Sequence, residues 1–335
     1  MSFKKYCCVF TILFVGLIYG QEGIPVYSDY LSDNLFLLHP SMAGAAAHNQ
    51  IRLTARKQWF DQDEAPNLQT LAANARFGER VGLGVVAYND QNGYHSQRGG
   101  SLSFAYHLMF SRSEADLNQL SFGIRAGLTQ SRLDETQFDP RDFDPIIAGI
   151  IQSSSYFNID LGLSYNFLEF SSNFTIKNVL FQNRTLYSEN GKFEPNNQRK
   201  YLLSGAYTIG KFGSLWSYEP SVLLQLAERT GQQTIDGNFK AYRKFDFGSL
   251  WGGISYRRSF DGAEYLDGTE INVQKLQYVT PILGTNYKNF VFAYTYSYQI
   301  GNVKFDNGGF HQITLGYDFL GGRPEPYDCN CPAVN

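Results

Sequence analysis

Long apolar runs are absent from the chain once its first twenty residues are set aside. No later stretch reaches eighteen consecutive apolar residues, so transmembrane helices are excluded. Methionine and tryptophan number only 3 each, and a formal net charge of −3 offers no basic excess for binding nucleic acid. The 335 residues are enough for two soluble domains or for one large β architecture.

Catalytic and metal-binding patterns are missing as well. The five histidines are scattered, without a His-Glu-x-x-His spacing. Gly82-Leu83-Gly84 lacks the third glycine and the following helix of a nucleotide loop, so we interpret these glycines as sites of close packing within a strand. We therefore expect no enzyme activity, no cofactor and no metal site.

A group of carboxylates falls between residues 132 and 155, in an expected loop. The twelve-residue calcium-loop pattern with its central glycine is not present there. We expect solvated acids, partly paired with Arg132 and Arg141. The acids are Asp134, Glu135, Asp139, Asp142 and Asp144.

Cysteine is confined to the two ends of the chain. Residues 1–20 have the basic start, apolar middle and small final residue of a cleaved signal peptide, and cleavage removes Cys7 and Cys8. Cys329 and Cys331 remain, in a Pro-rich tail. Because an exported protein meets oxidising conditions, we expect these two thiols to pair with each other or with a partner.

What the sequence has in quantity is aromatic residues and glycine, with 23 Tyr, 27 Phe and 32 Gly. The stretch Tyr156 to Phe167 alternates apolar and polar residues over its whole length. Successive strand residues point to opposite faces, and about 9–11 residues of a tilted strand cross a bilayer. Aromatic residues near both ends of the apolar face are typical of the two headgroup zones. This stretch predicts a transmembrane β-strand.

Similar segments follow one another from residue 49 to residue 320. They predict an all-β fold, a closed antiparallel transmembrane β-barrel of about 14 strands, with 12–16 possible. Closure removes the sheet edges that lipid could not satisfy. The expected strands are 49–59, 67–77, 80–89, 98–110, 119–131, 156–167, 169–178, 199–209, 216–226, 232–243, 247–258, 274–287, 289–300 and 309–320.

Loop lengths carry a second signal. Every other connection is expected to be longer, including 90–97, 132–155, 179–198 and 259–273, whereas most of the others are tight. This arrangement is typical of an outer-membrane barrel of a Gram-negative bacterium, with its termini in the periplasm. It leaves an irregular N-terminal segment, 21–48, in the periplasm or the lumen, and a periplasmic tail, 321–335. The polar strand faces are assigned to the interior, where an open lumen would make a passive or substrate-selective pore.

Several stretches resemble, in order, the PorP/SprF family of type IX secretion-system outer-membrane proteins of Bacteroidetes. Departures from the family pattern include His39, where Asn is usual, Ser297 and Gln312. The resembling stretches are Tyr27-Ser28-Asp29-Tyr30, HPSMAG at 39–44, Arg56-Lys57-Gln58-Trp59, GLGVVAYND at 82–90, RKYLLSGAY at 199–207, EPSVLL at 219–224, WGGISYR at 251–257, FAYTYSY at 292–298 and FHQITLGY at 310–317.

The resemblance implies a non-enzymatic barrel, set in outer-membrane lipid, that acts with type IX secretion. It implies two kinds of partner: a secreted surface protein or gliding-motility adhesin to be exported or anchored, and periplasmic lipoproteins of the secretion machine. Extended segments can pair with exposed strand edges, so the tail is a candidate docking segment. Its candidate partner-binding residues are Arg323, Tyr327, Cys329 and Cys331. An ordinary disordered terminus would have the same sequence features.

Overall fold

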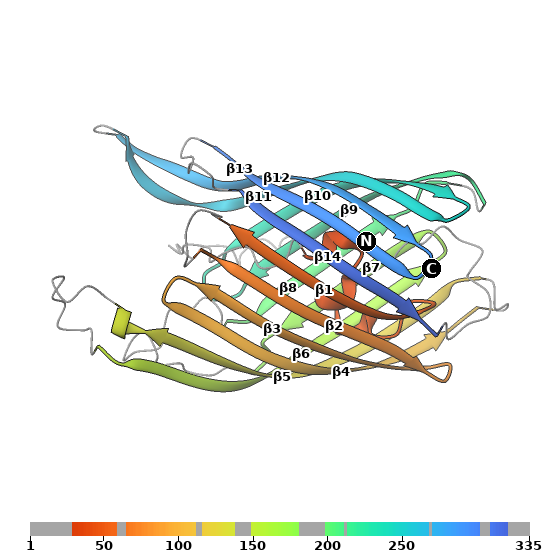
Figure 1. Cartoon of the computed structure of the whole chain (residues 1–335), viewed down its shortest axis with the longest axis horizontal. Helices are drawn as coiled ribbons and strands as arrows, with labels where there is room; N and C mark the ends of the chain where they lie inside the picture. Colours follow the sequence, from red (N-terminus) through yellow and green to blue (C-terminus); the bar gives the residue numbers. More distant parts are fainter. Residues whose placement is uncertain are drawn as a thin grey trace, which may run out of the picture.

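The chain forms a closed barrel of fourteen antiparallel strands (Figure 1). The structure, a computed structural model, describes residues 29–58, 65–111, 116–137, 149–180, 198–210, 213–267, 270–301 and 309–320. Each strand pairs with its neighbours in the sequence, and β1 closes the barrel by pairing with β14 from Asn49↔Phe319 to Gln58↔Phe310. The fold class and the number of strands expected from the sequence are thereby confirmed.

The strands have the following bounds: β1 Asn49–Gln58, β2 Asn67–Phe77, β3 Val81–Asn92, β4 His95–Met109, β5 Asn118–Asp134, β6 Ile151–Phe167, β7 Phe170–Lys177, β8 Lys200–Tyr207, β9 Trp216–Ala227, β10 Gln233–Phe245, β11 Gly248–Asp267, β12 Glu270–Tyr287, β13 Phe290–Ile300 and β14 Phe310–Phe319. Four 3-10 helices complete the described elements: η2 Asp29–Ser32, η3 Leu35–Leu37, η4 Pro40–Met42 and η5 Glu135–Gln137. None of the helices in these ranges is long and apolar enough to cross a membrane.

The alternation of side chains explains why these segments become barrel strands. On β6, Leu161 and Phe167 point outward and are exposed, whereas Ser164 and Asn166 point into the lumen and are fully buried. The same division runs around the barrel, and outward residues such as Leu102 are up to 70% exposed. An apolar outer face around a polar interior suits a barrel set in lipid.

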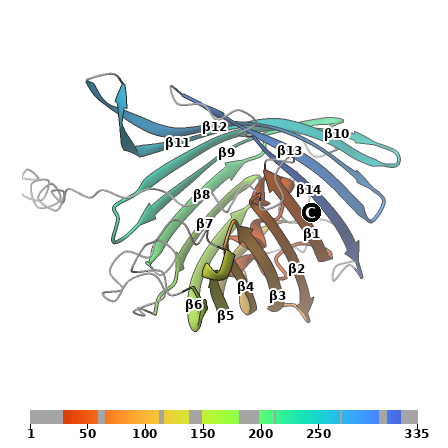
Figure 2. The same cartoon turned by 60° about the vertical axis from the view of Figure 1, so that its left-hand side comes forward.

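Connections 78–80, 168–169, 246–247 and 288–289 lie together at one end of the barrel, which we call the turn side. The opposite end is the loop side. Figure 2 shows that the β11–β12 hairpin projects farther than its neighbours on the loop side. Leu168 and Lys288 have positive φ values of 48° and 52° in their two-residue turns, as primed hairpin turns require.

Three loop-side connections differ from the expected lengths. The prediction of a long connection at 90–97 is wrong. Strands β3 and β4 pair as far as Asn92↔His95, so only a two-residue turn, Gly93-Tyr94, joins them. The loop expected at 259–273 is largely strand, since β11 and β12 pair out to Asp267↔Glu270. The loop expected at 132–155 is shorter, at 135–150, because β5 and β6 pair as far as Asp134↔Ile151. In these extensions the backbone pairing continues after the regular alternation of the sequence has ended.

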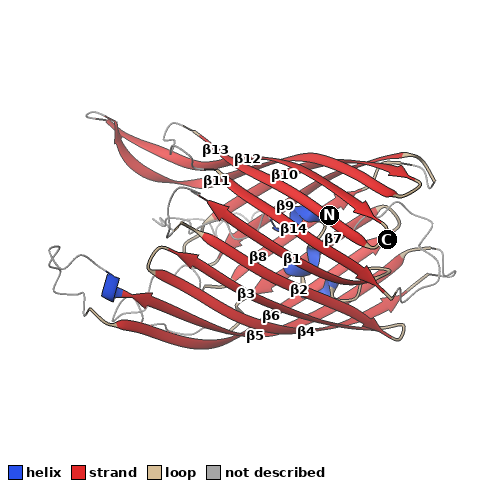
Figure 3. Cartoon of the chain, in the orientation of Figure 1, coloured by secondary structure: helices blue, strands red, loops and turns tan. Residues whose placement is uncertain are grey.

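Residues 29–48 lie inside the barrel rather than beneath it. The 3-10 helices η2, η3 and η4 are enclosed by the strands in Figure 3. Residues 30 to 47 are buried apart from two of intermediate exposure. We call residues 29–48 the plug.

Candidate functional site

The plug descends through the lumen toward the turn side. Its Tyr30 end contacts Asp236, nine positions before the turn-side end of β10 at Phe245. Its other end meets Asn74, three positions from the turn-side end of β2, before the chain enters β1 at Asn49. The plug therefore runs from the β10 wall at Asp236 to the turn-side end of the lumen, with its Tyr30 end highest toward the loop side.

The first anchor is a buried ion pair on the lumen wall. Arg257 on β11 donates from two guanidinium nitrogens to the two carboxylate oxygens of Asp236 on β10, each at 2.6 Å. The hydroxyl of Tyr30 donates to the same carboxylate at 2.9 Å and accepts from the Asn238 amide at 3.2 Å. A bidentate, charge-assisted pair is rigid, so it presents a fixed acceptor to the plug.

The second anchor uses a plug carboxylate. Asp33 forms an ion pair with Lys240 on β10 and accepts a hydrogen bond from the Tyr242 hydroxyl at 3.1 Å. The Lys240 ammonium also lies 5.3 Å from the centre of the Trp251 ring. Asp33 has a positive φ of 60°, a conformation that Asp tolerates better than most residues. The pair is largely buried, and Glu219 on β9, directly opposite Lys240, places a second buried carboxylate beside it.

The third anchor recognises the plug main chain. Arg125 on β5 donates to the carbonyl of Leu37 at 2.8 Å and to that of Phe36 at 2.5 Å, while its Nε donates to Ser103 at 3.0 Å. The guanidinium also lies over the Phe36 ring, 5.0 Å from its centre. Arg125 therefore satisfies two carbonyls of η3 that would otherwise be buried without a donor.

His39 sits at the centre of the plug, between two strands. Its Nδ1 is 2.8 Å from the Thr175 hydroxyl on β7, and its Nε2 is 3.0 Å from the Ser204 hydroxyl on β8. Burial lowers the pKa of His39 to about 3, with Arg125 and Lys177 adding to the effect. The imidazole is therefore neutral at physiological pH, with one ring nitrogen donating and the other accepting.

The turn-side end of the plug is held through its main chain. His107 on β4 donates from Nε2 to the carbonyl of Ala43 at 3.0 Å, and Arg76 on β2 donates to the carbonyl of Gly44 at 2.7 Å. The Asn74 side chain accepts from the Gly44 amide at 3.0 Å. All three contacts are made to main-chain atoms of the plug, and Gly44 has a positive φ of 63°, which favours glycine at this position.

Apolar packing links the plug to opposite walls. Tyr30, Leu31 and Leu38 pack against an apolar patch on the β8–β13 wall. Phe36, Leu37, Met42, Ala43 and Ala45 pack against Ala72, Val86 and Ala105 on the β2–β4 wall. The patch on the first wall consists of Leu202, Leu223, Tyr242, Trp251, Ile282 and Ala293. The plug thus fills the lumen from wall to wall.

Glycine on the lumen wall lets the plug backbone approach closely. A Cβ at Gly123 on β5 would lie 2.2 Å from the Ser41 nitrogen, and one at Gly82 on β3 would lie 1.9 Å from the Ala43 carbonyl oxygen. Both distances are far inside van der Waals contact. Gly82, which resembled part of a nucleotide loop, is therefore a site of close packing, as interpreted from the sequence.

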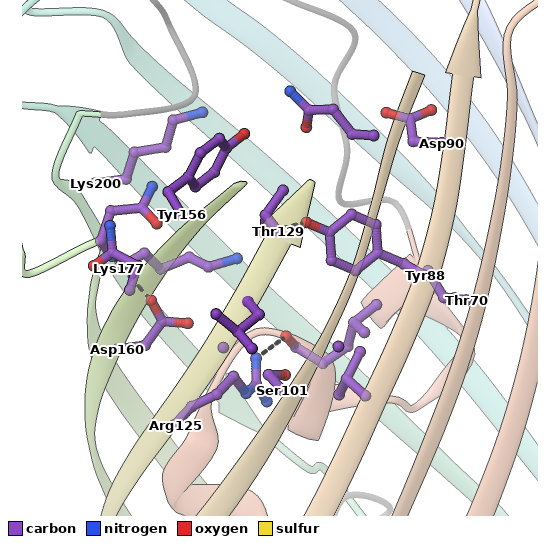
Figure 4. A pocket seen from close by; sticks show the side chains of 18 of the residues that line it. Thr70, Tyr88, Asp90, Ser101, Arg125, Thr129, Tyr156, Asp160, Lys177 and Lys200 are labelled. Atoms are coloured by element: carbon purple, nitrogen blue, oxygen red, sulfur yellow. Dashed lines mark hydrogen bonds between the residues drawn. The ribbon is translucent and has the colours of Figure 1, made fainter. Parts of the chain in front are cut away.

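On the loop side of the plug the lumen holds a chamber of about 200 Å³, with Leu37 and Arg125 at its base (Figure 4). One wall carries Lys177 and Lys200, which are directly opposite each other on β7 and β8. Tyr88 lies across from them and hydrogen-bonds Thr129 at 2.6 Å. The other labelled lining residues are Thr70, Asp90, Ser101, Tyr156 and Asp160. The chamber therefore carries charges of both signs, with Lys177 and Lys200 on one side and the carboxylates of Asp90 and Asp160 in the same lining.

The family model for type IX secretion system membrane protein PorP/SprF matches residues 20–317. The chain belongs to this PorP/SprF family. No curated protein matches its sequence. This membership, with the barrel fold, places the protein in the outer membrane.

Solved structures with the same type of barrel are distant from this PorP/SprF protein. The TodX monoaromatic hydrocarbon channel is 12% identical, covering 86% of this chain and 94% of its own, with a TM-score of 0.49. The CymD monoaromatic hydrocarbon channel is 13% identical, with coverages of 91% and 95% and a TM-score of 0.47. Omp33 of Acinetobacter baumannii is 8% identical, with coverages of 82% and 100% and a TM-score of 0.45.

Some of the candidate residues named from the sequence lie within the described part of the structure, and others lie outside it. Arg323, Tyr327, Cys329 and Cys331 lie outside the described residues, as do Arg141, Asp139, Asp142 and Asp144. Asp134 pairs with Arg132 at 3.0 Å at the end of β5, and Glu135 accepts from Gln152. Within the described ranges no three His, Cys, Asp or Glu side chains are grouped to hold a metal ion.

The apolar wall patch that packs on the plug was missed because the sequence interpretation assigned only the polar strand faces to the interior. A signal for the apolar wall patch was nevertheless present. Leu202-Leu203 and Leu223-Leu224 interrupt the alternation, so each pair places one leucine on each face. An apolar residue on the inner face of a barrel strand indicates an occupant of the lumen.

Proposed function

We propose that this PorP/SprF protein is a non-enzymatic component of type IX secretion that binds a secreted cell-surface protein and helps to export or anchor it. The observation that carries the proposal is the plug, held by buried ion pairs, main-chain hydrogen bonds and apolar packing on opposite walls. A lumen filled in this way suits a binding platform better than a conduit. In this account the turn side and the C-terminal tail face the periplasm, and the loop side faces outward.

The chamber gives the outward side a place for a partner. Its lysines, carboxylates and tyrosines receive a polar segment of the secreted protein, with the plug as the floor. On the periplasmic side, tail residues Arg323, Tyr327, Cys329 and Cys331 would contact lipoproteins of the secretion machine. Gliding motility and adhesin anchoring are the processes in which such a complex would act.

The test is a purification of the tagged protein from its native membrane in gentle detergent, followed by mass spectrometry. A large secreted surface protein should co-purify and be lost when connections 135–150 and 178–199 are shortened. Lipoproteins should be lost instead when residues 321–335 are replaced by a Gly-Ser segment of equal length. Each variant is the control for the other, because both retain the strands. Recovery of the barrel alone from native membranes would contradict the proposal and favour a pore.

A further inference from the structure

A groove runs along the lipid-facing surface of β9–β13, near the turn side. Its volume is about 710 Å³. Its floor is shallow because Ala241 and Gly252, which are directly opposite each other on β10 and β11, carry almost no side chain. Its walls are large exposed apolar side chains, namely Trp216, Leu250, Leu283, Phe292 and Tyr294. We call this feature the turn-side groove.

A fixed cation stands at one end of the groove. Arg243 lies two positions before the turn-side end of β10, directly opposite Trp216, the first residue of β9. Its guanidinium is 5.3 Å from the centre of the Trp216 ring and 4.9 Å from that of Phe245. Stacking on both rings holds the guanidinium in place. Within the described residues no carboxylate forms an ion pair with it.

The depth of the groove in the membrane identifies its occupant. The apolar walls face hydrocarbon, and aromatic residues at strand ends mark the headgroup level. Arg243 is therefore at the level of lipid phosphates, and a planar guanidinium suits bidentate phosphate binding. We propose that the turn-side groove binds one phospholipid, with an acyl chain over Ala241 and Gly252 and its phosphate on Arg243. Inorganic phosphate has no apolar part that could contact the groove walls, so the ligand is the intact lipid.

The test is native mass spectrometry of the purified barrel after incubation with phosphatidylglycerol in detergent. The wild-type protein should retain one lipid, and Arg243→Gln should lower its retention about tenfold. Gly252→Leu fills the floor and should also release the lipid while leaving Arg243 unchanged. Arg258→Gln, an exposed arginine on the loop-side part of β11, is the matched control and should retain the lipid.

Folding is checked for each variant by heat-modifiable mobility in gel electrophoresis. Ala241→Leu replaces Gly252→Leu if that variant does not fold. Lipid retention unaffected by Arg243→Gln and by filling the floor would overturn the proposal, as would equal loss from Arg258→Gln. Release of the lipid by millimolar inorganic phosphate would show that the headgroup alone binds, which also overturns it. A dimer peak that disappears when the floor is filled would assign the groove to a second copy of the chain.

Discussion

Arg125 on β5 donates a hydrogen bond to the main-chain carbonyl of Leu37 in the plug, at a distance of 2.8 Å. The barrel wall therefore recognises the backbone of the plug as well as its side chains. A plug held in this way stays in register even where its side chains vary. It also means that the strength of the closure depends on a few wall residues that can be changed one at a time.

Arg125→Met should loosen the plug without unfolding the barrel. It removes two charge-assisted bonds to plug carbonyls, each worth about 1.5–3 kcal/mol. Amide hydrogen exchange in residues 29–48 should then accelerate by about 10²- to 10⁴-fold, while exchange in the strands stays the same. Arg258→Met, at an exposed position, is the control. Unchanged plug exchange in Arg125→Met would show that this anchor has no role.

Ser41 and Ser164 should be replaceable by a disulfide that locks the plug to β6. Their hydroxyl oxygens are 2.6 Å apart. In a background with Cys329→Ser and Cys331→Ser, the double variant Ser41→Cys with Ser164→Cys should crosslink without added oxidant. The measurement is a gel shift on reduction after proteolysis between the two positions. The pair Ser41→Cys with Ser101→Cys is the control, and equal crosslinking of both pairs would contradict a single docked position.

Gly123→Ala should displace the plug, because the new methyl group would lie 2.2 Å from the Ser41 nitrogen and 2.4 Å from the Pro40 carbonyl carbon. The contact joins the β5 backbone to the plug backbone, and neither can move aside as a flexible side chain would. Gly100→Ala on β4 is the matched control, since its nearest neighbour would be the Val86 carbonyl oxygen at 3.7 Å. Faster plug exchange in the first variant alone is expected, and equal behaviour of the two would count against close packing.

Plug docking should weaken in acid because of His39. The docked imidazole has its pKa lowered to about 3 by burial, whereas the released segment should titrate near the ordinary value of 6.5. Docking is therefore strongest above pH 6.5 and loses about 1.4 kcal/mol per pH unit below it, or about 2 kcal/mol at pH 5.

The measurement is the protection factor of plug amides at pH 7 and pH 5, which corrects for the intrinsic exchange rate. His39→Asn, the residue usual in the family, should dock with a smaller loss of protection between these pH values. Identical pH dependence of the two proteins would assign the acid sensitivity to another group.

The sequence predicted the barrel because its alternation comes from the membrane itself: lipid requires the outward residues to be apolar. The β5 and β6 segments show this pattern at every position of the belt. The plug could not be predicted in the same way, because residues 29–48 have no period and their contacts come from strands distant in sequence. Arg125 and Asp236 lie on strand faces that the sequence assigned to the interior, but no sequence pattern pairs them with Phe36, Leu37 and Tyr30.

The central claim is that the plug closes the barrel, and single-channel conductance in planar bilayers tests it most directly. The full-length protein should conduct little, whereas a variant in which residues 29–46 are replaced by a short Gly-Ser linker should open steady, large channels. Heat-modifiable mobility confirms that both proteins are folded. Steady conductance of the same size from both would contradict the claim.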